Sequence, residues 1–133
     1  MSDEPDHSDE AVRELATRVF DMARAGDAAS LASYVDAGVP VNLTNEKGDT
    51  LVMLAAYHGH ADAVAVLVAR GAEVDRLNDR GQSPLAGAVF KGEEAVVHAL
   101  VAGGADPLAG HPTAVDTARM FEREDLLAIL TAP

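Results

Sequence analysis

The sequence of 133 residues has no cysteine and no tryptophan, and only two tyrosines and three phenylalanines. The absence of cysteine excludes disulfides, thiolate metal sites and a cysteine nucleophile, and it is compatible with a reducing compartment. Because aromatic residues are scarce, alanine, valine and leucine must fill most of the core. This composition favours closely packed helices over a sandwich of sheets.

Basic residues are also scarce. Ten lysines and arginines face 22 aspartates and glutamates, so the net charge is −12. Such a chain repels a phosphate backbone, which argues against nucleic-acid binding and favours a basic partner. No apolar run is long enough to cross a membrane and no signal peptide is apparent, so we expect a cytoplasmic protein. The opening residues, MSDEPDHSDE, are acidic, and we expect residues 1–8 to form a disordered leader.

The middle of the chain repeats itself with an offset of 33 residues. GDTLVMLAAYHGHADAVAVLVARGAEVD (48–75) aligns without a gap on GQSPLAGAVFKGEEAVVHALVAGGADPL (81–108). The same offset relates Gly26 to Gly59, and a shortened copy begins at residue 113. A fixed period of this size is typical of a solenoid of stacked units.

Each unit contains the signals of two short helices. Thr50 and Ser83 are good helix N-caps, and Gly59 and Gly92 are suited to the turns between helices. Ser8 is the expected N-cap of a longer first helix. The predicted helices are 9–24, 28–36, 51–58, 61–69, 84–91, 94–102, 114–121 and 124–130, with no strand beyond the turns.

These features resemble the ankyrin repeat, which has a period of 33 and a Thr-Pro-Leu-His-x-Ala signature. The signature appears as TLVMLA (50–55) and SPLAGA (83–88), and the Gly-His pair of the family appears as Gly59-His60. The resemblance implies an all-α solenoid of four helix-turn-helix units with β-turn fingers. We expect this domain at residues 9–131, with units at about 9–44, 45–77, 78–110 and 111–131.

The chain contains residues that could suggest chemistry, but their spacing does not support it. His58 and His60 lie two residues apart, whereas metal-binding histidines on a helix are usually three or four apart. The corresponding residues of the next unit, Lys91 and Glu93, supply no third ligand of the same kind. We therefore expect His60 to be a hydrogen-bonding turn residue and His58 a surface residue. We predict no metal site, no cofactor and no catalytic residue.

The resemblance implies that the concave face binds another protein, through the fingers and the exposed side of the first helix of each unit. Tyr57 and Phe90 occupy the same repeat position, and Met120 is their counterpart in the last unit. Aromatic residues are enriched at binding hot spots, but these rings could instead only fill space beside the fingers. The expected partner-binding residues are Glu46, Lys47, Asp49, Tyr57, His58, Leu77, Asp79, Arg80, Gln82, Phe90, Lys91 and Met120.

The role implied is that of a stand-alone adaptor, inhibitor or stabilising subunit that is monomeric without its partner. Small bacterial ankyrin proteins are the nearest analogy, and some of them accompany an enzyme such as a catalase. Self-association into a homo-oligomer is the alternative hypothesis. A small enzyme or metal protein is a third reading that no group of residues supports.

Overall fold

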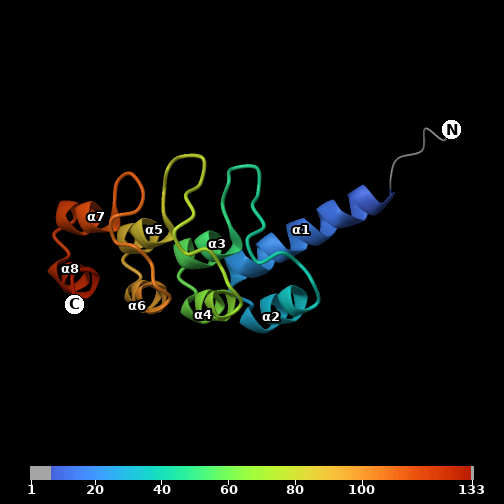
Figure 1. Ribbon diagram of the computed structural model, residues 1–133, viewed down its shortest axis with the longest axis horizontal. Helices are drawn as coiled ribbons and strands as arrows, with labels where there is room; N and C mark the ends of the chain where they lie inside the picture. Colours follow the sequence, from blue (N-terminus) through green and yellow to red (C-terminus); the bar gives the residue numbers. More distant parts are fainter. Residues whose placement is uncertain (1–6, 133) are drawn as a thin grey trace.

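The computed structural model describes residues 7–132, which form eight α-helices and no strand (Figure 1). This confirms the all-α prediction, and five of the helices have the bounds expected from the repeat. The helices are α1 (His7–Ala25), α2 (Ala28–Asp36), α3 (Leu51–Tyr57), α4 (Ala61–Ala69), α5 (Pro84–Lys91), α6 (Glu94–Ala102), α7 (Ala114–Met120) and α8 (Glu124–Leu130).

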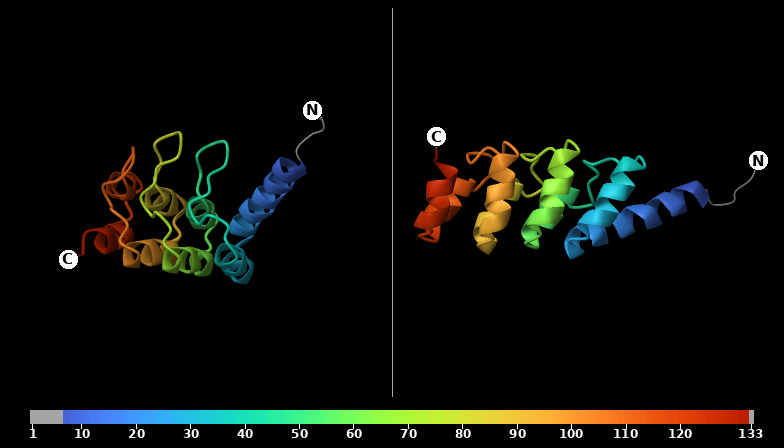
Figure 2. Two further views of the ribbon diagram at one scale, coloured as in Figure 1. Left: turned by 45° about the vertical axis from the view of Figure 1, so that its right-hand side comes forward. Right: turned by 90° about the horizontal axis from the view of Figure 1, so that it is seen from below.

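The helices are arranged in two rows. In Figure 1 and in the left view of Figure 2, α3, α5 and α7 lie side by side with one end of α1, while α2, α4, α6 and α8 form a second row beneath them. Three loops project from the same side of the array, between α2 and α3, α4 and α5, and α6 and α7. The first two loops contain the predicted fingers, residues 44–49 and 77–82, so the fingers stand next to the row that includes α3 and α5.

The core runs continuously between the two rows and is aliphatic, as the composition predicts. Val64 and Leu67 of α4 are fully buried, and so are Val97 and Leu100 at the corresponding positions of α6. Burying a side chain of this size contributes about 1.5–3 kcal/mol relative to leaving it in water. Each helix pair is too small to enclose these residues by itself, so neighbouring pairs must stack.

A hydroxyl group caps the first helix of each unit after the first. The backbone N–H groups of Met53, Ala86 and Asp116 donate to the side-chain oxygens of Thr50, Ser83 and Thr113, at 3.1, 3.0 and 3.0 Å. Two of these caps, Thr50 and Ser83, were predicted and are confirmed. Each bond satisfies one of the donors that a helix start leaves unpaired, which is typically worth about 1 kcal/mol.

The turn between the two helices of a unit accommodates a side chain of the next unit. Gly26 has a positive φ of 74°, and a Cβ at this position would overlap the His60 ring. The His60 ring is held there because its Nε2 donates to the carbonyl of Arg24 at 2.8 Å. His60 is thus a hydrogen-bonding residue, as expected, and its bond joins two units. The same arrangement pairs Gly59 with Glu93 and Gly92 with Arg123.

Helix α1 differs from the prediction at its start. It is the longest helix, with 19 residues, and Ser8 lies within it, so the expectation that Ser8 is its N-cap is wrong. Most of the expected leader, residues 1–6, falls outside the described residues. Val12, in the first half of α1, is 63% exposed, whereas Val19 and Ala23, in its second half, are buried. None of the helices within residues 7–132 is both long and apolar enough to cross a membrane.

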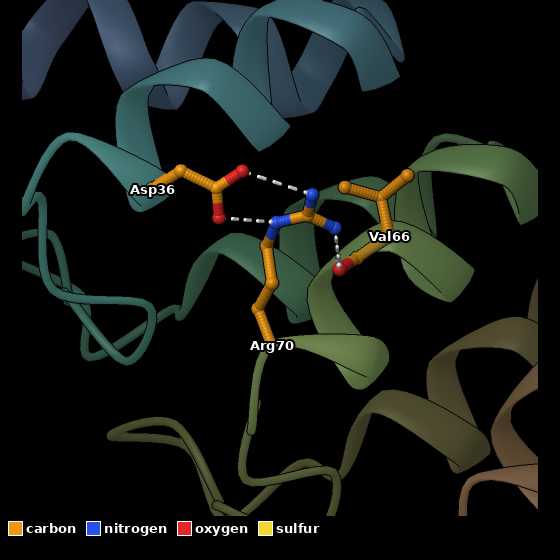
Figure 3. Close-up of polar contacts among 3 residues, drawn as sticks. All are labelled: Asp36, Val66 and Arg70. Carbon is orange, nitrogen blue, oxygen red and sulfur yellow. Dashed lines mark hydrogen bonds and ion pairs between the residues drawn. The ribbon is translucent and has the colours of Figure 1, made fainter.

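An ion pair joins two units on the second row of helices. Arg70 donates from Nε and Nη2 to the two carboxylate oxygens of Asp36, at 2.9 and 3.1 Å, and from Nη1 to the carbonyl of Val66 at 3.2 Å (Figure 3). The hydrogen bonds from Arg70 hold the pKa of Asp36 below its ordinary value of 3.8. The pair therefore stabilises the folded chain only when Asp36 is ionised.

Asp36→Asn should reduce stability in a pH-dependent way. A carboxylate whose pKa is lowered by folding stabilises the fold above its ordinary pKa, and this contribution disappears as the pH falls through the folded-state value. Urea unfolding should therefore show the original chain more stable than Asp36→Asn at pH 7, with the difference shrinking below about pH 4. Glu14→Gln, at an exposed helical site, is the control. A difference that stays constant down to pH 3 would contradict the role of this pair.

Gly26→Ala should destabilise the array more than Gly71→Ala. Both glycines have a positive φ, so both substitutions should incur the left-handed penalty of about 1–2 kcal/mol. Nothing lies within 4 Å of a Cβ at Gly71, whereas a Cβ at Gly26 meets His60. Displacing that ring should add about 1–3 kcal/mol, as overpacking does. Equal losses in urea unfolding would show that the contact with His60 is unimportant.

Candidate functional site

Each of the two fingers is closed by its own asparagine, and the two asparagines occupy equivalent positions of the repeat. In the first finger, Asn45 Oδ1 accepts hydrogen bonds from the backbone N–H groups of Lys47 and Asp49, both at 3.0 Å. In the second finger, Asn78 Oδ1 accepts from Arg80 and Gln82, also at 3.0 Å. Asparagine favours such turns because its side chain can bond to backbone groups two residues further along the chain. The charged residues at the fingertips are therefore carried on ordered turns.

The fingers are also bonded to each other. The backbone N–H of Asp79 donates to the carbonyl of Lys47 at 3.0 Å. Asn78 Nδ2 donates to Asp49 Oδ1 and to Gln82 Oε1, each at 2.9 Å. Asn78 is thus central to the site, although it was not among the predicted residues. The sequence signal was its alignment with Asn45, 33 residues earlier.

A hollow of about 440 Å³ lies between the fingers and α3, and we call it the finger hollow. It brings together seven of the twelve predicted partner-binding residues. Its walls combine the charged groups of both fingers with the apolar side chains of Met53 and Leu54. The full lining is Glu46, Lys47, Asp49, Met53, Leu54, Tyr57, Asn78, Asp79, Arg80 and Gln82.

A second hollow of about 280 Å³ adjoins the first, and we call it the apolar hollow. It shares Met53, Tyr57 and Gln82 with the finger hollow, so the two hollows lie next to each other. No charged residue lines it. Its lining comes from α3, α5 and α7 and from neighbouring loop residues: Met53, Tyr57, Gln82, Ala86, Gly87, Phe90, Pro112, Thr117, Met120 and Phe121.

Tyr57, Phe90 and Met120, the equivalent residues of three units, lie on this face and are accessible to solvent. Tyr57 is 42% exposed, Phe90 58% and Met120 67%, and all three line the apolar hollow. The Phe90 ring packs edge-on against Phe121, with ring centroids 5.6 Å apart. Sequence reasoning missed Phe121, because the repeat aligns Met120 with Phe90 and places Phe121 one position later. These rings contact one another and also leave a large surface exposed to solvent.

Three predicted residues line neither hollow. Leu77, the first residue of the second finger, is 38% exposed. His58 packs edge-on against Tyr57, with ring centroids 5.6 Å apart, and Lys91 places its Nζ 5.0 Å from the centre of the same ring. His58 and Lys91 therefore flank Tyr57. Partial burial, aided by the positive charges of Arg24 and Lys91, lowers the pKa of His58 below its ordinary value of 6.5 and favours the neutral ring at pH 7.

The two closely spaced histidines are used in different ways. His60 bonds to the carbonyl of Arg24, whereas His58 is exposed beside Tyr57. Within residues 7–132 no three histidine or acidic side chains converge to hold a metal ion. The arrangement on this face is that of a surface with two hollows, one charged and one apolar.

Comparison with known proteins gives a consistent result. The sequence model of the ankyrin repeat family, in three copies, matches residues 19–110, which is more than half of the chain. A curated protein of Pseudomonas aeruginosa, named as an ankyrin repeat protein, is 46% identical over 61 residues. The aligned segment covers 45% of this chain and 36% of that protein, so the chain spans about a third of the length of this relative.

Proposed function

Because the chain belongs to the ankyrin repeat family, whose members are generally protein–protein interaction modules and typically non-catalytic, we propose that it binds a protein partner through one face. We call this the groove face: the two fingers together with the exposed sides of α3, α5 and α7. The chain acts there without catalysis and without a cofactor. Its role is that of an adaptor, an inhibitor or a stabilising subunit.

The adjacency of the two hollows on one exposed face carries this proposal. Tyr57, Phe90, Met120 and Phe121 are all exposed, and all line the apolar hollow. Large apolar side chains gathered on one exposed face are typical of interaction sites, whereas scattered ones need no explanation. The adjoining charged fingers would form the polar rim that surrounds such a core in protein interfaces.

The polar residues of the proposed interface are Glu46, Lys47, Asp49, Asp79, Arg80, Gln82 and Lys91, with His58 and Leu77 at its edge. They would select among partners, since charges at the edge of an interface affect specificity and association rate more than affinity. The net charge of −12 favours a partner with a basic contact surface.

Self-association is the competing use of the same face, because a second copy could also cover the apolar hollow. A net charge of −12 opposes the approach of two copies. The isolated protein should therefore be a monomer in light scattering. A stable homodimer that dissociates on Phe90→Ala would replace the proposed function with self-association.

Loss of the two rings should weaken partner binding much more than folding. The protein is used as bait with extract from its source organism, the captured partner is identified by mass spectrometry, and its purified form is titrated. Tyr57→Ala/Phe90→Ala should reduce affinity by about 2–4 kcal/mol, as aromatic hot spots do. Because both rings are substantially exposed, urea unfolding should change by less than the 2–5 kcal/mol that Leu85→Ala, at a fully buried site, is expected to cost.

Val12→Ala is the matched binding control, because Val12 is an exposed apolar residue that lines neither hollow. It should leave the affinity unchanged. If the ring variant loses several kcal/mol of stability while its folded fraction binds normally, the rings serve only internal packing. The proposed groove face would then be wrong.

A further inference from the structure

We infer that the groove face recognises a partner segment that carries a basic side chain close to a bulky apolar one. The basic group pairs with Asp49 in the finger hollow, and the apolar group enters the apolar hollow beside Phe90. This inference rests on the proposed function and specifies the chemistry of the partner.

Asp49 is the positioned charge of the finger hollow. It is half-buried, whereas the other four charged residues in the lining are exposed. Its Oδ1 accepts from Asn78 Nδ2 at 2.9 Å, and its backbone N–H is held by Asn45. A carboxylate fixed in this way loses little conformational freedom when it binds a cation, which is the advantage of preorganisation.

The other four charged residues of the finger hollow are two acids and two bases, so their formal charges sum to zero. Glu46 is followed by Lys47 at the tip of the first finger, and Asp79 is followed by Arg80 at the tip of the second. The lining thus contains three acidic and two basic residues, so its net charge is −1. Among the described residues, none of these five takes part in an ion pair, although five such pairs exist elsewhere. Asp49 is therefore available and is not compensated by a neighbouring cation.

The apolar hollow selects the second feature of the segment. It contains no charged lining residue, and its lining includes the Phe90 and Phe121 rings, which pack edge-on against each other. Its volume of about 280 Å³ is just below the roughly 300–1,000 Å³ typical of small-molecule sites. That size suits one or two bulky side chains of a peptide rather than a complete small-molecule ligand.

The shared wall of the two hollows places the two requirements close together. Tyr57 lines both, as do Met53 and Gln82. A single short segment can therefore present its cation to one hollow and its apolar side chain to the other. The charge of −12 on the whole chain also disfavours an acidic segment at long range.

A displayed library of short random peptides tests the inference with a defined probe. Selection on the intact protein should enrich peptides in which arginine or lysine lies within a few residues of a bulky aliphatic or aromatic residue. Individual synthetic peptides are then titrated against Asp49→Asn, whose amide oxygen can still accept from Asn78. We expect at least a tenfold loss of affinity. Asp62→Asn, at an exposed acid outside both hollows, should cause none.

A double-mutant cycle connects the cation to Asp49. Replacing the basic residue of the peptide by glutamine should cause little further loss once Asp49 is asparagine, because the two changes remove the same contact. If the two changes reduce the affinity by independent factors, so that the double change gives their product, the basic side chain does not pair with Asp49. Enrichment of acidic peptides, or no enrichment at all, would also overturn the inference.

Phe90→Ala distinguishes this inference from the proposed function. If binding of the peptides needs Phe90 but not Asp49, the groove face binds proteins and the inferred chemistry is wrong. If binding needs neither residue, the groove face is not the binding site and both proposals fail.

Discussion

The close approach of neighbouring units at their turn glycines is the constraint on which the array depends. At Gly26, Gly59 and Gly92 the space that a Cβ would occupy is filled by a side chain of the next unit, from His60, Glu93 and Arg123 respectively. The positive φ at these glycines reverses the chain between two helices, and the absent side chain admits the neighbour. Because this contact recurs, α1, α3, α5 and α7 form one row (Figure 2). The groove face consists of the exposed sides of α3, α5 and α7 in that row, together with the two fingers.

The fold could be predicted from the sequence because its determinants are local and recur. The period of 33 located the helices, and the caps at Thr50 and Ser83 fixed two of their starts. The start of α1 was predicted wrongly. Serine is a common N-cap residue, but Ser8 lies inside α1, which the structure describes from His7 onward. A cap residue in an acidic, uniformly polar stretch has no apolar periodicity beside it to set the boundary.

The candidate site was only partly predictable, because its decisive contacts join residues about 30 positions apart. The bond from Asn78 to Asp49 and the bond from Asp79 to Lys47 depend on how far one finger lies from the next. Sequence alignment cannot supply that distance. Likewise, the Phe121 ring contacts Phe90, although the repeat aligns Phe90 with Met120 and not with Phe121. The structure thus adds Asn78 and Phe121 to the expected residues and places His58, Leu77 and Lys91 outside the two hollows.

The central claim is that partner recognition belongs to the groove face and not to the second row of helices. Amide chemical shifts of the isotopically labelled protein, recorded during titration with the captured partner, test it most directly. The account predicts that the perturbed amides lie in the fingers, residues 44–49 and 77–82, and along α3, α5 and α7, while α2, α4, α6 and α8 change little. Perturbations concentrated on α2, α4, α6 and α8, with the fingers unchanged, would contradict it.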